Sequence, residues 1–108
     1  MIRGYSKQEM DNMDFPASQY SFPDAPGEGA ATLVMKQWGK QNVLICYFNM
    51  DDGKKLKLCV WFSRNASRTY RPWHSDLDLS YIGLNSRLHI SYDVNESGKS
   101  RFLNAELL

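Results

Sequence analysis

The chain has 108 residues, of which 43% are hydrophobic and 23% are charged, and its formal net charge is +1. This composition excludes a disordered chain and predicts a single globular domain, which buries about 65% of the surface that the unfolded chain exposes. Because the net charge is close to zero, an anionic partner has to be met by a local basic patch.

The cellular compartment is predicted from what the sequence lacks. The N-terminal residues contain no apolar segment of a secretory signal, and no apolar run approaches the roughly 20 residues of a membrane-spanning helix. We therefore expect a cytoplasmic protein without membrane contact. Two cysteines are too few for a disulfide scaffold, and reduced thiols are the default in that compartment.

The N-terminal part is predicted to form a short helix and an extended arm. Ser6 and Glu9 have the spacing of a capping box, which predicts a helix from Lys7 to about Met13. Residues 15–29 contain three prolines, two glycines and three aromatic rings, so they are expected to form an arm. Two interpretations are open: the arm straps its rings onto the domain, or it pairs with another chain.

A first strand is predicted from Ala30 to Trp38. Simple alternation along it places Leu33, Met35 and Gln37 on one side, and the other side is predicted to hold Thr32, Val34, Lys36 and Trp38.

The clearest pattern follows, where two β-rich runs flank Asp52 and Gly53. That dipeptide favours a two-residue hairpin turn, because glycine tolerates the positive φ angle that the turn needs. A four-residue loop would change the partners but keep the two faces. The predicted core face holds Val43, Ile45, Tyr47, Leu56, Leu58, Val60 and Phe62, and the predicted outer face holds Leu44, Cys46, Phe48, Met50, Lys55, Lys57, Cys59 and Trp61.

The same register places Cys46 opposite Cys59. We expect two reduced, half-buried thiols at these positions, and a cross-strand disulfide is the alternative.

The remainder is predicted to be a loop, a short helix and a second hairpin. The loop after Phe62 shows no apolar period, and the spacing of Ser75 and Asp78 predicts a capped helix through Leu77 to Ile82. Residues 86–94 alternate as a strand, residues 95–99 form a turn around Gly98, and residues 101–107 form the last strand.

This order of elements resembles the oligonucleotide/oligosaccharide-binding (OB) fold, a five-stranded, partly open barrel with a helix between its third and fourth strands. The resemblance covers roughly residues 30–107 and includes the tail Gly83…Leu88-x-Ile90…Gly98-Lys99. We expect a mostly β protein, either a small OB-like barrel or a curved antiparallel sheet, with residues 1–29 as the helix and arm and residues 30–108 as the β domain.

Catalytic and metal-binding chemistry has little support in the sequence. The histidines with carboxylate neighbours, His74 and His89, are expected to be solvated surface residues. The cysteines and histidines lack metal-ligand spacing, and there is no glycine-rich phosphate-binding motif. We therefore expect a protein that is not an enzyme and that has no cofactor or metal.

Aromatic rings alternate with cations along the first strand, the hairpin and the following loop. This combination is typical of binding to single-stranded nucleic acid, because bases stack on rings and the backbone needs positive charge. The OB resemblance implies the same face, on the second and third strands. The candidate nucleic-acid-binding residues are Lys36, Trp38, Phe48, Lys55, Lys57, Trp61, Arg64, Arg68, Tyr70, Arg71 and Trp73.

Several hypotheses follow for the function. The first is binding of single-stranded DNA or RNA, as in a small accessory protein of replication, repair or a mobile element. The alternative is a protein–protein interaction module, an adaptor or inhibitor, or a homo-oligomer, using the same face or the arm, because exposed aromatic and arginine side chains are typical of interface hot spots. In a purely structural interpretation, Phe48 and Trp61 belong to the core beneath the N-terminal arm or the short helix, and Lys55 and Lys57 keep an exposed strand from aggregating.

Overall fold

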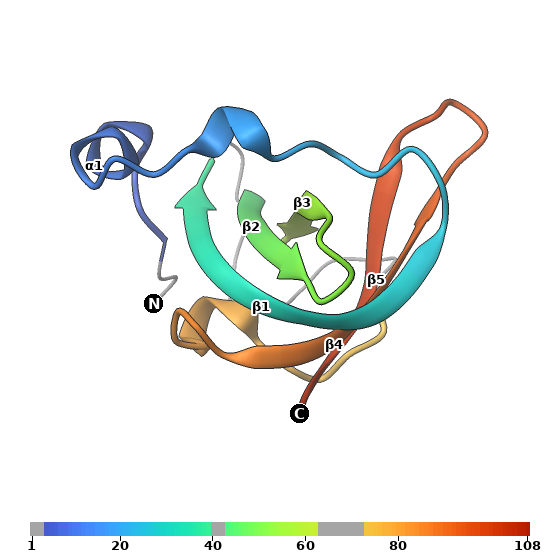
Figure 1. The fold of residues 1–108 in the computed structure, drawn as a ribbon. Helices are drawn as coiled ribbons and strands as arrows, with labels where there is room; N and C mark the ends of the chain where they lie inside the picture. The colour runs from blue at the N-terminus through green and yellow to red at the C-terminus, as the bar shows by residue number, and fades with distance from the viewer. Residues whose placement is uncertain (1–3, 40–42, 63–72) are drawn as a thin grey trace.

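The computed structural model describes residues 4–39, 43–62 and 73–108. It contains a five-stranded antiparallel sheet with the strand order β3-β2-β1-β4-β5. Figure 1 shows the strong curvature of the sheet, which brings the edge strands β3 and β5 into contact. The mostly β prediction is therefore confirmed. The strands are β1 Gly27–Trp38, β2 Val43–Met50, β3 Lys55–Trp61, β4 Arg87–Val94 and β5 Ser100–Leu107.

The helical elements in the described ranges are all short. Helix α1 spans Lys7–Asn12, and two 3-10 turns span Ala17–Gln19 (η1) and Leu79–Tyr81 (η2). The predicted capping box of α1 is confirmed, because the Glu9 N–H donates to Ser6 Oγ at 3.1 Å and the Ser6 N–H donates to Glu9 Oε1 at 3.0 Å. Among the described residues, no helix is long and apolar enough to cross a membrane.

The second predicted cap is one turn away from its expected place. Asp78, and not Ser75, caps η2 by accepting a hydrogen bond from the Ser80 N–H at 3.0 Å. The Ser75 hydroxyl instead donates to the Ala105 carbonyl at 2.6 Å, which ties this segment to β5.

The turn of the first hairpin has three residues, so the predicted register is wrong by one. Gly53 has φ +97°, and its N–H donates to the Met50 carbonyl at 3.0 Å. Phe48 therefore pairs with Leu56 rather than Lys57. Because side chains alternate along a strand, a shift of one residue turns every β2 side chain to the other face.

The interior of the sheet consequently differs from the predicted core face. Ile45 and Tyr47, which were expected inside, lie on the outer face, whereas the predicted interior positions of β3 are confirmed. Strands β2 and β3 together contribute seven side chains to the main core: Leu44, Cys46, Phe48, Met50, Leu56, Leu58 and Val60.

The two cysteines do not face each other. Cys46 pairs with Leu58, and Cys59 pairs with Ile45, so the two thiols lie on opposite faces of the hairpin. Both are free thiols, and burial raises the pKa of each.

Strand β1 also departs from simple alternation, because its register shifts between Leu33 and Met35. Leu33 points into the core before this irregularity, and Lys36 is buried after it. Met35 and Gln37 lie on the outer face, where Met35 packs against Tyr47. The predicted side-chain directions of β1 are therefore wrong beyond Leu33.

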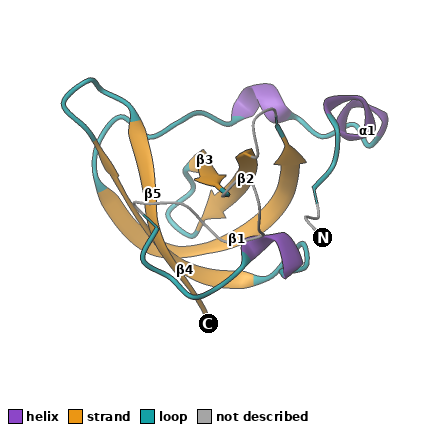
Figure 2. Ribbon diagram, turned by 180° about the vertical axis from the view of Figure 1, so that it is seen from behind, coloured by secondary structure: helices purple, strands orange, loops and turns teal. Residues whose placement is uncertain are grey.

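The N-terminal segment packs against the outside of the sheet. Met10 and Tyr20 form a second apolar cluster with Met35 and Tyr47, separate from the main core. Figure 2 shows this segment outside the curved sheet, with α1 beyond the end of β1. The structure agrees with the interpretation that the arm straps its rings onto the domain.

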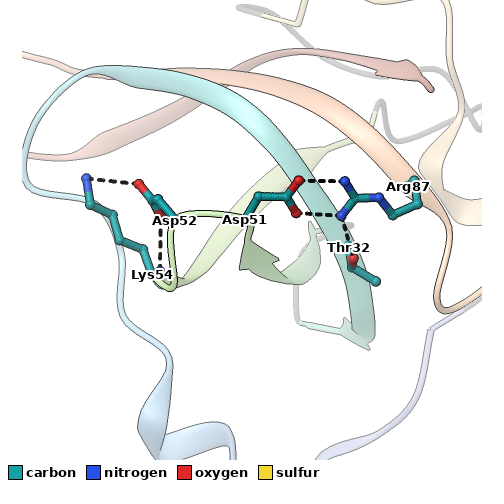
Figure 3. A network of polar contacts seen from close by, with 5 residues as sticks. All are labelled: Thr32, Asp51, Asp52, Lys54 and Arg87. Atoms are coloured by element: carbon teal, nitrogen blue, oxygen red, sulfur yellow. Dashed lines mark hydrogen bonds and ion pairs between the residues drawn. The ribbon is translucent and has the colours of Figure 1, made fainter.

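The turn of the first hairpin is tied to the start of β4. Arg87 holds both carboxylate oxygens of Asp51, with Nη2 2.6 Å from Oδ2, and its Nη1 lies 3.1 Å from the Thr32 hydroxyl of β1 (Figure 3). The hydrogen bonds from Arg87 lower the pKa of Asp51. This network fixes the hairpin turn relative to β1 and β4.

Candidate nucleic-acid interface

Phe48 is fully buried in the main core. Its ring meets the ring of Phe102 edge-on, with 5.6 Å between the centroids. The expectation that Phe48 stacks on a ligand is therefore wrong, and the cause is the one-residue register shift between β2 and β3.

Lys36 is also inside the protein, with only 5% of its surface exposed. Its Nζ donates to the carbonyl oxygens of Leu79 and Ser80 at 3.2 Å each, and to that of Ile82 at 2.5 Å. The lysine thus satisfies backbone acceptors around η2 and secures this turn against the sheet. Its expected contact with a phosphate is not compatible with this position.

The two tryptophans Trp38 and Trp73 are largely covered. Trp38 is half-buried and packs against the core, 6.5 Å from Phe62 between ring centroids. Trp73 is buried, its ring lies 4.7 Å from that of Phe102, and its Nε1 has no hydrogen-bond partner in the described part of the chain.

The outer face of β3 retains the other described candidates. Lys55, Lys57 and Trp61 alternate with the buried residues of this strand, as predicted. Trp61 is 45% exposed, which leaves its indole ring accessible to a ligand.

The N-terminal arm adds aromatic groups to this face. The Lys57 Nζ lies 4.8 Å from the centroid of the Phe22 ring, and Phe22 is 46% exposed. The Lys55 Nζ lies 2.7 Å from Gln19 Oε1 and 5.7 Å from the centroid of the Tyr20 ring. We call Lys55, Lys57 and Trp61, which share the outer face of β3, the β3 platform.

The lysines of the β3 platform differ electrostatically from the arginines of the sheet. Arg87 and Arg101 each bind both oxygens of an aspartate. Lys55 and Lys57 contact an amide oxygen and aromatic rings, and within the described ranges no carboxylate compensates their positive charges. An added anion therefore meets two available charges here.

A pocket of about 50 Å³ adjoins the β3 platform where β3 approaches β5. Trp61 lies at the boundary between the two features, because it contributes to the pocket lining as well as to the outer face of β3. The other side chains of the lining include Cys59, Trp73, Arg101 and Phe102.

Sequence reasoning missed Phe22. The arm contains three aromatic rings, but their composition does not indicate which one reaches a lysine on β3. Four predicted residues, Arg64, Arg68, Tyr70 and Arg71, lie outside the described residues.

The described histidines and carboxylates do not converge. The His89 Nε2 lies 3.7 Å from Glu28 Oε2, whereas Asp93 pairs with Arg101. Across residues 4–39, 43–62 and 73–108, no group of three or more histidine, cysteine or acidic side chains is placed to hold a metal ion.

Comparisons with known proteins do not identify a family. No protein-family model, no curated protein and no solved structure matches the chain.

Proposed function

We propose that the protein binds single-stranded DNA or RNA without catalysing a reaction, as a small accessory protein of replication, repair or a mobile element. The observation that carries the proposal is the β3 platform, where exposed Trp61 shares one strand face with two lysines that have no carboxylate partner among the described residues. The ring provides a stacking surface for a base, and the lysines provide charge for the adjoining phosphates.

The magnitudes fit a modest, salt-sensitive interaction. One base stacked on an aromatic side chain contributes about 1–3 kcal/mol. Two neutralised phosphates of a single strand give a slope of about −1.4 in a plot of log K against log salt concentration. Because the net charge of the whole chain is only +1, the attraction has to come from a local basic patch, which we assign to the platform and the adjoining arginine-rich loop.

The arrangement of the strands supports the same proposal. Strand β1 lies between β2 and β4, and the curved sheet brings its edge strands β3 and β5 into contact. This resembles the OB fold, whose second and third strands carry the ligand-binding face. In the described residues between β3 and β4 the helical element is the 3-10 turn η2, which is shorter than the helix that OB folds have there.

A salt titration tests the proposal. Labelled single strands of mixed sequence, as DNA and as RNA, are titrated with the protein by fluorescence anisotropy, and a duplex of the same sequence serves as the control. We expect single strands to bind more tightly than the duplex, and their binding to weaken as salt rises. Absence of binding by every strand at low salt would overturn the proposal.

The second candidate function is binding to another protein through the same surface. The observation that favours it is the exposure of Phe22 and Trp61, two large apolar side chains of the kind that anchor interfaces. Light scattering and a pull-down test this alternative. A protein that stays monomeric at all concentrations and recovers no partner counts against it.

A further inference from the structure

The outer face of the sheet continues beyond the β3 platform, beneath the N-terminal arm. Tyr47 pairs with Lys57 across the β2–β3 hairpin, so its ring belongs to the same face. Only 3% of Tyr47 is exposed, because Phe15 and Tyr20 cover it. Their ring centroids lie 5.1 Å and 5.4 Å from that of Tyr47, both in edge-on geometry.

The arm therefore places its own rings where a single-stranded ligand would place bases. Phe22 lies against Lys57 of the platform, and Phe15 and Tyr20 lie against Tyr47. A ring over a cation is also a contact that a base makes with a lysine. The Tyr47 ring, which Phe15 and Tyr20 cover edge-on, is an aromatic surface on which a base can stack once it is uncovered.

Residues 5–22, which comprise helix α1 and the first part of the arm, are held to the sheet by few backbone contacts. Ser21 forms an isolated bridge at Leu56, in which the Lys57 N–H donates to the Ser21 carbonyl at 3.0 Å. Tyr5 forms a second isolated bridge, in which the Trp38 N–H donates to the Tyr5 carbonyl at 2.9 Å. Each bridge has one further hydrogen bond, from the Ser21 N–H to the Lys55 carbonyl and from the Tyr5 N–H to the Lys36 carbonyl. Release of residues 5–22 breaks these bonds and the side-chain bonds Tyr20–Asn49 and Lys55–Gln19, and it leaves the ladders between the five strands intact.

The apolar side-chain contacts of residues 5–22 are separate from the main core. Met10 and Tyr20 belong to the outer cluster with Met35 and Tyr47, and the main core contains no residue of the arm. A segment with its own small cluster and few backbone bonds is the kind that opens without global unfolding.

We infer that residues 5–22 form a strap that competes with single-stranded nucleic acid for the outer face, so that opening of the strap adds Tyr47 to the binding surface. This inference rests on the proposed function. A site that the strap covers for most of the time binds its ligand with an affinity reduced by the fraction of open molecules. Loosening the strap therefore tightens binding.

Two methionines of the strap provide a matched pair of variants. Met10 is buried in the outer cluster, whereas Met13 is 49% exposed at the end of the same helix. Met10→Ala removes a contact that holds the strap closed. Met13→Ala makes the same chemical change without removing such a contact, and it serves as the control.

Hydrogen exchange measures the opening of the strap directly. The amides of Lys57 and Trp38 donate to strap carbonyls, whereas the Leu58 amide points toward β2, because N–H groups alternate along a strand. We expect the Lys57 and Trp38 amides to exchange at least about tenfold faster than that of Leu58, and faster still in Met10→Ala. Equal exchange at all three amides would overturn the inference.

Binding of a labelled single strand completes the test. We expect Met10→Ala to bind at least about threefold more tightly than the unaltered protein, and Met13→Ala to bind as the unaltered protein does. If the unaltered protein binds and Met10→Ala binds equally or more weakly, the strap is not a competitor, although the proposed function stands. If none of the three proteins binds, the proposed function is wrong, and the inference that the strap competes with nucleic acid is wrong as well.

Discussion

The Nζ of Lys57 lies 4.8 Å from the centroid of the Phe22 ring, on the side of β3 that faces away from the core. This contact joins two segments that are far apart in the sequence, the N-terminal arm and the first hairpin. A ring attracts a cation without neutralising its charge, so Lys57 remains available to an anion. The contact thus connects the strap, the β3 platform and the proposed function.

The burial of Phe48 predicts a clear contrast with Trp61. Phe48→Ala removes a fully buried ring and should lower the free energy of unfolding by about 3–5 kcal/mol. Trp61→Ala changes a half-exposed side chain and should lower it by less than about 1 kcal/mol. Urea denaturation of both variants measures the difference. Equal stability of Phe48→Ala and the unaltered protein would place this ring outside the core.

The buried Lys36 should matter for stability. Lys36→Met keeps most of the side-chain volume but leaves the carbonyls of Leu79 and Ser80 without this donor. Because unsatisfied buried acceptors are costly, we expect a loss of about 1–3 kcal/mol in the free energy of unfolding. Lys55→Met changes an exposed lysine and should alter stability by no more than about 0.5 kcal/mol. Equal effects in the two variants would contradict the assigned role of Lys36.

The ion pair between Asp51 and Arg87 predicts a pH dependence of stability. Hydrogen bonds from Arg87 lower the pKa of Asp51 from its ordinary value of 3.8. A carboxylate with a lowered folded-state pKa stabilises the protein above its ordinary pKa, and this contribution disappears as the pH falls through the lowered value. Urea midpoints of the unaltered protein should therefore fall as acid protonates Asp51.

Asp51→Asn should lower the urea midpoint at neutral pH. It should also make the urea midpoint less dependent on pH in the acid range. Asp52→Asn is the matched control, since Asp52 lies in the same turn and its only ion pair is a 3.8 Å contact with exposed Lys54 among the described residues. A larger effect of the Asp52 substitution would contradict the importance of the Arg87 contact.

The sequence predicted the elements well where its pattern was unambiguous. Leu88, Ile90 and Tyr92 alternate with polar residues, and all three point into the core of the sheet. The capping box of α1 and the turn at Gly98, with φ +81°, also follow from local rules. Local chemistry fixed these elements, so no tertiary information was needed.

The face of β2 could not be predicted in the same way. The stretch from Val43 to Phe48 is apolar at every position, so the pattern does not indicate which side chains point inward. The length of the turn then determines which β2 side chains point inward. One additional residue before Gly53 exchanges the inner and outer faces of β2. A two-residue turn therefore predicts Phe48 on the ligand surface, whereas the observed three-residue turn places it in the core.

The irregularity in β1 has no signal in the sequence either. It lies between Leu33 and Met35, in a stretch without glycine or proline to mark it. Because it reverses the alternation, Lys36 enters the interior although a lysine in a strand is ordinarily exposed. The β3 side of the candidate site was predicted, since hydrophobic and polar residues alternate clearly there.

The most direct test of the account compares two lysine substitutions by salt titration of a labelled single strand. Lys57→Ala removes a platform charge, and Lys99→Ala removes an exposed charge from the loop between β4 and β5 (Figure 1). We predict that Lys57→Ala weakens binding and makes the slope of log K against log salt shallower by about 0.7. Lys99→Ala should leave both unchanged. Equal affinities and slopes for the two variants and the unaltered protein would contradict the proposed role of the β3 platform.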